Sequence, residues 1–159
     1  MEKCKRDPLL IVGLGNPGKR YEQTRHNFGF QVVQSFALKN NLSFKKHREF
    51  KGEIAEGQWK EKKILLFLPT TYMNLSGEAV RRVIKFYKVL VENLIIVVDD
   101  IAIPFSALRY RSQGSSGGHN GLKSIREHLG TDEYQRLKMG VGDNGFEPLD
   151  EYVLSQFTK

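Results

Sequence analysis

The sequence predicts an α/β fold with a mixed β-sheet in a single domain. Three apolar runs of strand length, at 9–13, 63–68 and 94–98, have the pattern of buried strands. Segments with helical spacing of apolar residues alternate with these runs, as is typical of α/β proteins. A short link also joins the run at 63–68 to a preceding strand pattern, which indicates a hairpin. The sheet is therefore expected to contain both parallel and antiparallel strands.

The length and composition fit one globular domain. A chain of 159 residues can bury about 68–70% of the surface of the unfolded polypeptide. Residues 1–8 are charged and are expected to form an N-terminal leader, followed by the domain at 9–159. No run has the apolar length of a signal peptide or a membrane span, so the predicted location is cytoplasmic. Cys4 is the single cysteine, which excludes an intramolecular disulfide and a thiolate metal cluster.

The chain is basic, with 25 Lys and Arg residues against 18 Asp and Glu and a net charge of +7 at pH 7. A surplus of this size favours polyanionic partners, nucleic acid above all. Charge alone does not distinguish RNA from DNA.

The first half of the chain is predicted to form a strand, a helix and a hairpin. Leu9–Gly13 is the first buried strand, and the spacing of apolar residues predicts a helix over 26–39. Residues 43–57 are expected to form one exposed strand that turns at Gly57 into the buried strand 63–68.

The second half of the chain continues this alternation. Two further helices are expected, over 77–88 and after His119, because apolar residues recur there at helical spacing. The other expected elements are the strands 94–98, Leu108–Arg111 and 136–142 and a short final element at 149–157.

A tight polar turn directly follows the first strand. It reads GLGNPG at 13–18 and satisfies the G-x-G-x-x-G fingerprint of dinucleotide-binding sites. That fingerprint also needs a helix opened by the third glycine, and an acidic residue about 20 residues later at the end of the next strand. The sequence after Gly18 meets neither condition, so dinucleotide binding is a minor alternative. Asn16 and the later His26 are better candidates for function.

Polar clusters follow the three buried strands and the Gly/Ser-rich loop at 112–118. In chain order they are Asn16 with His26, Tyr72-Met73-Asn74, Asp99, and His119-Asn120. If the strands are parallel neighbours, these clusters meet at one edge of the sheet, where α/β proteins bind ligands.

Such a set of side chains is sufficient for hydrolysis by water. The imidazole of His26 would take a proton from water, and the Asp99 carboxylate would hold its other nitrogen and fix the tautomer. Side-chain amides would orient the substrate and donate to a developing oxyanion. No serine or cysteine lies in the context of a nucleophile elbow, and no zinc-ligand spacing such as H-E-x-x-H occurs, so water attack without a metal is expected.

Each of these residues also has a structural interpretation. Asn74 could cap a helix and Asp99 a following turn. His47 and His128 are assumed to be structural. Spacing alone therefore indicates no more than a candidate hydrolase.

Five segments together resemble bacterial peptidyl-tRNA hydrolases. They are GLGNPGKRYEQTRHNFGF, PTTYMNLSG, VVDDIAIP, GSSGGHNGLKSI and RLKMGVG. The resemblance extends from about Leu9 to Phe157 and implies a monomer with a twisted, mixed β-sheet sandwiched between helices. It also implies hydrolysis of the ester joining a peptide to the 3′-terminal ribose of tRNA, which frees tRNA for translation without metal or cofactor. Family members commonly continue for a few more helical turns, so the C-terminal helical segment is expected to be short or missing here.

The resemblance also implies roles for particular residues. His26 matches the catalytic base of the family and Asp99 the carboxylate that partners it. Asn16 and Asn74 match amides that position substrate and water, and Asn120 an amide that contacts the tRNA end and the peptide backbone. Four further substrate-binding candidates lie along the channel for the peptide and the 3′ end: Tyr21, Tyr72, Met73 and His119. Arg111 and Lys138 match basic residues that bind the tRNA 5′-phosphate.

The alternative is a non-catalytic RNA-binding module on the same scaffold. A protein that only binds RNA has no physical need for a paired base and carboxylate. Because His26 and Asp99 occur together with both amides, hydrolysis is the favoured function.

Overall fold

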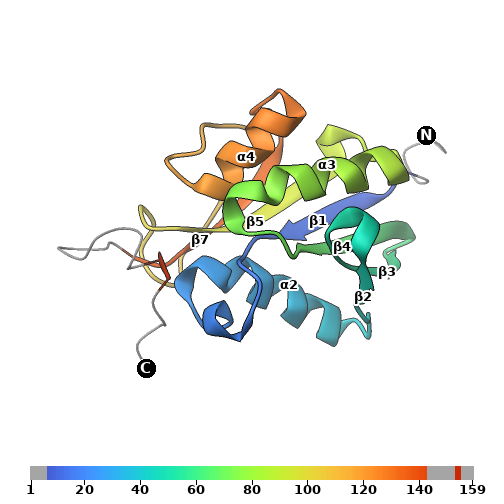
Figure 1. The fold of residues 1–159 in the computed structure, drawn as a ribbon, viewed down its shortest axis with the longest axis horizontal. Coiled ribbons are helices and arrows are strands. Elements are labelled where there is room, and N and C mark those ends of the chain that lie inside the picture. Colours follow the sequence, from blue (N-terminus) through green and yellow to red (C-terminus); the bar gives the residue numbers. More distant parts are fainter. Residues whose placement is uncertain (1–6, 143–152, 155–159) are drawn as a thin grey trace.

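A computed structural model describes residues 7–142 and 153–154, which form an α/β domain around one seven-stranded sheet (Figure 1). The strands are β1 (Leu9–Gly13), β2 (Lys45–His47), β3 (Gly52–Trp59), β4 (Lys62–Pro69), β5 (Leu94–Asp100), β6 (Leu108–Arg111) and β7 (Gln135–Gly140). Their order in the sheet is β2-β3-β4-β1-β5-β7-β6. Most of the predicted leader 1–8 and of the predicted element 149–157 lies outside the described residues.

The centre of the sheet is parallel and its edges are antiparallel. Strands β4, β1, β5 and β7 run in one direction, whereas β3 pairs antiparallel with β4 and β6 antiparallel with β7. The central strands are almost entirely buried, as expected for parallel strands that are covered on both faces. The predicted mixed sheet is confirmed, and its parallel strands all end at the same edge.

Helices cover both faces of the sheet (Figure 1). They are α2 (Phe28–Lys39), α3 (Ser76–Tyr87) and α4 (Asn120–Leu129). Helices α3 and α4 pack together on one face, and α2 lies alone on the other. One apolar cluster includes residues of α3, α4 and the sheet, and a second includes residues of α2 and the sheet. The helix-covered sheet implied by the family resemblance is therefore confirmed. Among the described residues, no helix combines the length and apolar character needed to cross a bilayer.

The start of α2 lies unusually close to the sheet. A Cβ atom on Gly29 would overlap the carbonyl oxygen of Val97 in β5, and one on Gly13 would overlap the carbonyl oxygen of Gly29. Both positions must therefore be glycine for this approach. The contact brings the turn before α2, which carries His26, to the end of β5.

The prediction of one continuous strand at 43–57 is wrong. The structure contains two strands, β2 and β3, separated by a 3₁₀ turn at Arg48–Phe50. The side chain of Phe50 is buried in the core, and Lys51 has a left-handed φ of 54°. At this break the chain turns toward α3, where the ring of Phe50 packs against the rings of Phe86 and Tyr87.

The predicted turn at Gly57 is also wrong. Gly57 lies within β3 and pairs with Ile64 of β4. The hairpin turns instead at Lys60 and Glu61, which both have positive φ, as a tight two-residue hairpin requires. Gly57 fits a strand because the side chain of Leu42 fills the space that its own Cβ would need.

Other differences from the predicted elements concern boundaries. A 3₁₀ turn at Arg25–Asn27 precedes α2, so the helix begins two residues later than predicted. Strand β5 extends two residues further than predicted and therefore includes Asp99 and Asp100. The boundaries of α3 and β7 differ from the predicted ones by one or two residues.

Candidate active site

A cavity of about 860 Å³ lies at the carboxyl ends of the parallel strands. All the predicted site residues except Tyr21 and Arg111 line it. The predicted meeting of the polar clusters at one edge of the sheet is therefore found in the structure.

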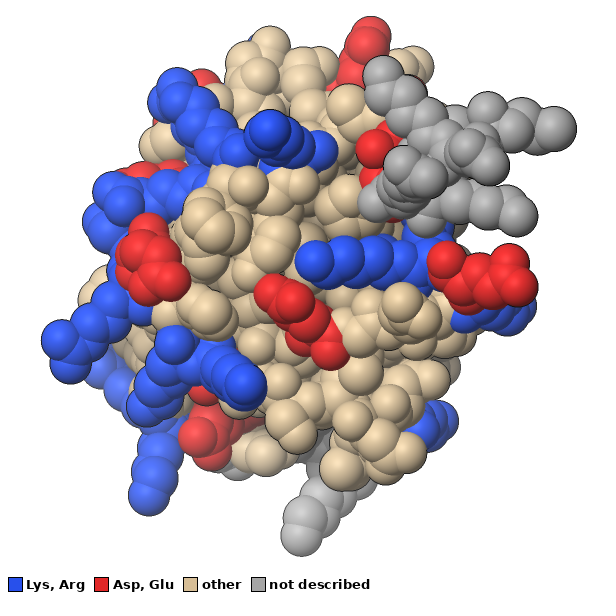
Figure 2. Space-filling view, turned by 90° about the vertical axis from the view of Figure 1, so that its right-hand side faces the viewer, with Lys and Arg blue, Asp and Glu red and all other residues tan. Residues whose placement is uncertain are grey.

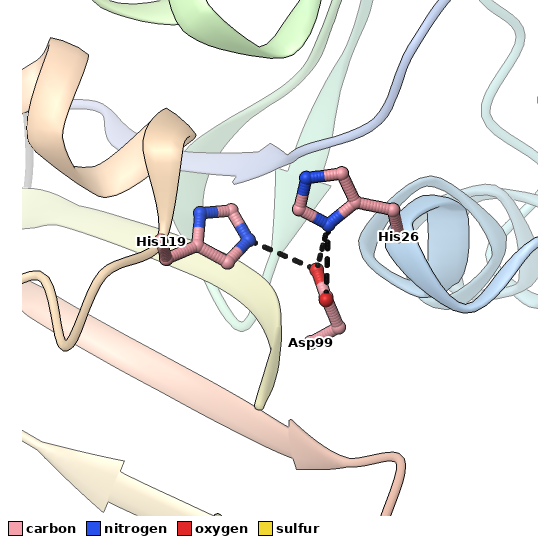
Figure 3. Close-up of side chains that lie close together, drawn as sticks. All are labelled: His26, Asp99 and His119. Atoms are coloured by element: carbon pink, nitrogen blue, oxygen red, sulfur yellow. Dashed lines mark hydrogen bonds and ion pairs between the residues drawn. The ribbon is translucent and has the colours of Figure 1, made fainter. Parts of the chain in front are cut away.

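The innermost part of the cavity is a histidine–carboxylate pair. The Nδ1 atom of His26 lies 2.9 and 3.0 Å from the two carboxylate oxygens of Asp99. Both side chains are buried, with 7% of His26 and 4% of Asp99 exposed. A carboxylate only accepts hydrogen bonds, so Nδ1 of His26 carries the hydrogen and donates it. The lone pair of His26 is therefore on Nε2, the nitrogen that does not face Asp99 (Figure 3).

A second histidine contacts the same carboxylate from the other side (Figure 3). Nε2 of His119 lies 2.9 Å from Oδ1 of Asp99, and the centres of the two imidazole rings are 4.8 Å apart. The family resemblance implies a place for His119 along the substrate channel, but this contact was not predicted. The signal for it is weak, because it consists only of a histidine directly before a helix.

Asp99 is ionised at neutral pH. Burial raises the pKa of its carboxyl group, but the contacts with His119 and His26 outweigh burial and lower the pKa below its ordinary value. The carboxylate therefore remains an acceptor for both imidazoles.

His26, Asp99 and His119 also form a group that resembles a metal site, since their ligand atoms lie within 4.8 Å of one another. The donor chemistry does not fit a metal ion. Nδ1 of His119 accepts the backbone N–H groups of Gly121 and Leu122, at 3.1 and 3.4 Å, so the hydrogen of this ring is on Nε2. Both ring nitrogens that face Asp99 thus carry hydrogen, whereas a metal ligand must offer a lone pair.

Asn16 is held in the turn after β1 by three hydrogen bonds. Its backbone N–H donates to Oδ1 of Asn27, and its carbonyl oxygen accepts from Nδ2 of Asn27, both at 2.8 Å. The side-chain Oδ1 of Asn16 accepts the backbone N–H of Met73 at 2.7 Å. Because Oδ1 is occupied by this contact, the side-chain NH₂ group is the part of Asn16 that remains to bind a ligand. Asn27 was missed by the sequence analysis, although it directly follows His26.

The same turn does not have the structure of a dinucleotide-binding loop. The third glycine of the pattern, Gly18, precedes a 3₁₀ turn at Lys19–Tyr21 rather than an α-helix. The helix N-terminus that would hold a pyrophosphate is therefore missing at this place.

The segment after β4 forms another wall of the cavity. Met73 is buried, whereas Tyr72 is 59% exposed. Asn74 faces the cavity and does not cap α3, whose N-cap residue is Leu75. The residue that caps the turn after β5 is Asp100, not Asp99: Oδ1 of Asp100 accepts the N–H of Ala102 at 2.8 Å. The structural alternatives for Asn74 and Asp99 are thus not observed.

The Gly/Ser-rich loop at 112–118 leads to His119 and is held by a buried arginine. Arg136 in β7 is fully buried, and its guanidinium donates to the carbonyl oxygens of Ser115, Asp132 and Tyr134. Arg136 also lies over the ring of Tyr134, 4.1 Å from its centroid. One of these hydrogen bonds therefore holds the loop at Ser115, four residues before His119.

Basic side chains approach the cavity from the strands β6 and β7. Lys138 lines the cavity, with its Nζ 3.6 Å from Asp100, and Arg109 is its cross-strand neighbour and also lines the cavity. Arg111 is exposed two residues further along β6 and lies outside the cavity lining. Arg109 was missed by the sequence analysis, although it alternates with Arg111 on the same strand.

Basic residues are not confined to this side of the molecule. Figure 2 shows the face at the amino ends of the parallel strands, where Lys and Arg side chains gather along one edge among several acidic ones. The net charge therefore indicates a polyanionic partner but does not locate the site.

Three other predicted residues lie away from the cavity. Tyr21 is in the 3₁₀ turn at Lys19–Tyr21, with the guanidinium of Arg20 5.1 Å from its ring centroid. His47 contacts Glu49, and His128 contacts the carbonyl oxygen of Ser124. These contacts fit the structural roles assumed for His47 and His128, and a substrate contact for Tyr21 stays a prediction.

Comparison with known proteins identifies the family. The family model described as "Peptidyl-tRNA hydrolase" matches residues 10–159. The chain belongs to the peptidyl-tRNA hydrolase family. A peptidyl-tRNA hydrolase of Clostridium perfringens is 50% identical over 151 residues, which cover 95% of this chain and 79% of that protein. One of Bacillus cereus is 48% identical over 151 residues, with 94% and 80% covered.

Solved structures of the family have the same fold. The crystal structure of peptidyl-tRNA hydrolase from Acinetobacter baumannii has a TM-score of 0.90 and 37% sequence identity to this chain. The match covers 97% of this chain and 78% of that protein. The family resemblance noted in the sequence is confirmed.

Proposed function

We propose that this peptidyl-tRNA hydrolase cleaves the ester bond between peptide and tRNA with a water molecule activated by His26. The observation that carries the proposal is the buried His26–Asp99 pair at the wall of the cavity. An ionised carboxylate holds Nδ1–H of the imidazole, so Nε2 is the basic nitrogen. No cofactor or metal ion takes part in the proposed reaction.

In the first step, Nε2 of His26 takes a proton from water while the water oxygen attacks the ester carbonyl carbon. A tetrahedral oxyanion forms and the imidazole becomes an imidazolium, which the Asp99 carboxylate stabilises. The oxyanion then collapses, the bond to the 3′-ribose oxygen breaks, and His26 returns the proton to that oxygen. The products are the free peptide acid and free tRNA.

Side-chain amides are proposed to stabilise this reaction. The NH₂ group of Asn16 is directed by its bond to Met73, and the amide of Asn74 faces the same cavity. Such donors stabilise charge that develops on an ester oxygen, because they are already oriented before the reaction. Asn120 at the start of α4 is proposed to bind the peptide backbone and the tRNA end.

The tRNA is proposed to lie along the basic side of the cavity. Lys138 and Arg111 would bind the 5′-phosphate, with Arg109 beside Lys138 at the cavity. The peptide would pass the exposed ring of Tyr72 and the buried Met73. We expect an active monomer over 9–159, as the family resemblance implies. We expect it in the cytoplasm, where translation supplies the substrate.

The test is release of free tRNA from a purified N-blocked aminoacyl-tRNA in the presence of EDTA. We expect hydrolysis at a rate that EDTA does not change. Binding of the RNA without release of tRNA would contradict the proposed function and support a non-catalytic RNA-binding module.

Replacing Arg111 with alanine is expected to weaken substrate binding and leave kcat nearly unchanged. KM should rise several-fold, and the slope of log KM against log salt concentration should decrease by about 1, because one phosphate contact is lost. Lys45→Ala is the matched control, since it removes the same charge from β2 at the opposite edge of the sheet. Equal effects of the two variants on KM would show that Arg111 acts only through the net charge.

A further inference from the structure

We propose that His119 is a positioning residue for the reaction: it holds the Asp99 carboxylate through a neutral imidazole whose tautomer is set by the backbone of α4. This inference rests on the proposed function of the His26–Asp99 pair. The contacts that carry it lie on both sides of the His119 ring.

The first contact determines where the hydrogen of the ring is. His119 is the N-cap residue of α4, and its Nδ1 accepts the backbone N–H groups of Gly121 and Leu122. Backbone amides only donate, so Nδ1 must carry a lone pair. A hydrogen on Nδ1 would face two other hydrogens and leave two N–H groups of the first helical turn without an acceptor. The ring is therefore neutral, with its hydrogen on Nε2.

The second contact uses that hydrogen. Nε2–H of His119 donates to Oδ1 of Asp99 at 2.9 Å, and the same oxygen accepts from Nδ1 of His26. Only 10% of the His119 side chain and 3% of the Asp99 side chain are exposed, so little water competes for the bond. A donor with a fixed direction on each side restrains rotation of the carboxylate about its own axis.

The helix that carries His119 is itself held against the site. A Cβ atom on Gly121 would overlap the side chains of Leu14 and Met73, so the first turn of α4 fits closely between them. Met73 in turn donates its N–H to Asn16. His119 therefore connects the catalytic carboxylate to a packed part of the fold rather than to a free loop.

This arrangement predicts that the two nitrogens of His119 have separable tasks. In an asparagine side chain, the amide oxygen reaches about as far as Nδ1 of histidine, and asparagine is a favourable N-cap residue. In a glutamine side chain, the amide nitrogen reaches about as far as Nε2. His119→Asn should keep the cap and lose the bond to Asp99, and His119→Gln should keep that bond and lose the cap.

The kinetic test compares the two variants on N-blocked aminoacyl-tRNA. We expect His119→Asn to lower kcat about tenfold, the size of effect of one hydrogen bond to a charged group, with KM and the thermal midpoint nearly unchanged. His119→Gln should keep kcat within about threefold of the wild type and lower the thermal midpoint. His47→Asn, at a half-buried histidine outside the cavity, is the control. A kcat of His119→Asn within twofold of the wild type would overturn the proposal, as would an equal loss of kcat in both variants.

A spectroscopic test needs no substrate and so separates failure of this inference from failure of the proposed function. The ¹⁵N chemical shifts of the imidazole nitrogens, recorded on wild-type protein at pH 7, distinguish the two neutral tautomers from imidazolium. The His119 signal is identified by its loss in His119→Asn. We expect the Nε2–H tautomer, and either the Nδ1–H tautomer or an imidazolium would overturn the proposal.

Discussion

Replacing His26 with alanine is expected to lower kcat by a factor of about 10²–10⁴, the usual contribution of a general base. The reason is that Nε2 of His26 is the nitrogen proposed to accept the proton of the attacking water. KM should change little, because the amides and basic residues that are proposed to bind the substrate remain. The measurement is single-turnover release of tRNA from N-blocked aminoacyl-tRNA by saturating enzyme.

The control for this variant is His47→Ala. His47 pairs with Glu49 on the surface, at a position away from the cavity, so its loss should leave kcat within about twofold of the wild type. Circular dichroism should show that both variants are folded. Activity of His26→Ala close to that of the wild type would eliminate His26 as the base.

Asp99→Asn, which replaces one carboxylate oxygen with an NH₂ group, is expected to lower kcat by a factor of about 10³–10⁴. No other replacement of a single polar atom in the site should have so large an effect. The amide NH₂ of an asparagine at this position can donate to Nδ1 of His26, which moves the ring hydrogen to Nε2. The ring then presents an N–H group to the water in place of a lone pair and cannot take its proton. Steady-state kinetics across pH 6–9 measures the loss, and a recovery of full kcat anywhere in this range would contradict the proposed role of Asp99.

The matched control is Asp132→Asn, the same substitution at a carboxylate that pairs with Arg126 outside the cavity. It should leave kcat nearly unchanged. A comparable loss of kcat in Asp132→Asn would show that the effect of the Asp99 substitution is not specific to the site.

The same substitution should also change how stability depends on pH. Because the pKa of Asp99 is lowered in the folded protein, its ionised form stabilises the fold above the pKa of the unfolded chain, near 3.9. This contribution is lost as the pH falls toward the lower pKa of the folded state. Urea unfolding between pH 5 and pH 3 should therefore show a steeper loss of unfolding free energy in the wild type than in Asp99→Asn. Parallel curves would show that the Asp99 pKa is not lowered by folding.

Several features of the fold could be predicted from local sequence. The apolar runs in β1, β4 and β5 are long enough and uniform enough to identify strands that are buried on both faces. Polar residues directly after these strands then had to meet at one edge if the strands were parallel. Local sequence did not predict the break at Arg48–Phe50, because burial of Phe50 depends on a core formed by distant elements.

The sequence by itself determined the class of fold, the family and most of the residues around the cavity, because these depend on local patterns and on motifs. Only the tertiary structure decided which of these residues are partners. His26 and Asp99 are 73 residues apart in the chain and Asp99 and His119 are 20 apart, so both contacts depend on strand order and on the packing of α2 and α4. The tautomer of His119 depends on the N–H groups at the start of α4. The orientation of Asn16 depends on the N–H group of Met73, which lies in a different loop. A hydrogen bond needs its two groups within about 3 Å, and only the packed chain brings residues so far apart in sequence to that distance.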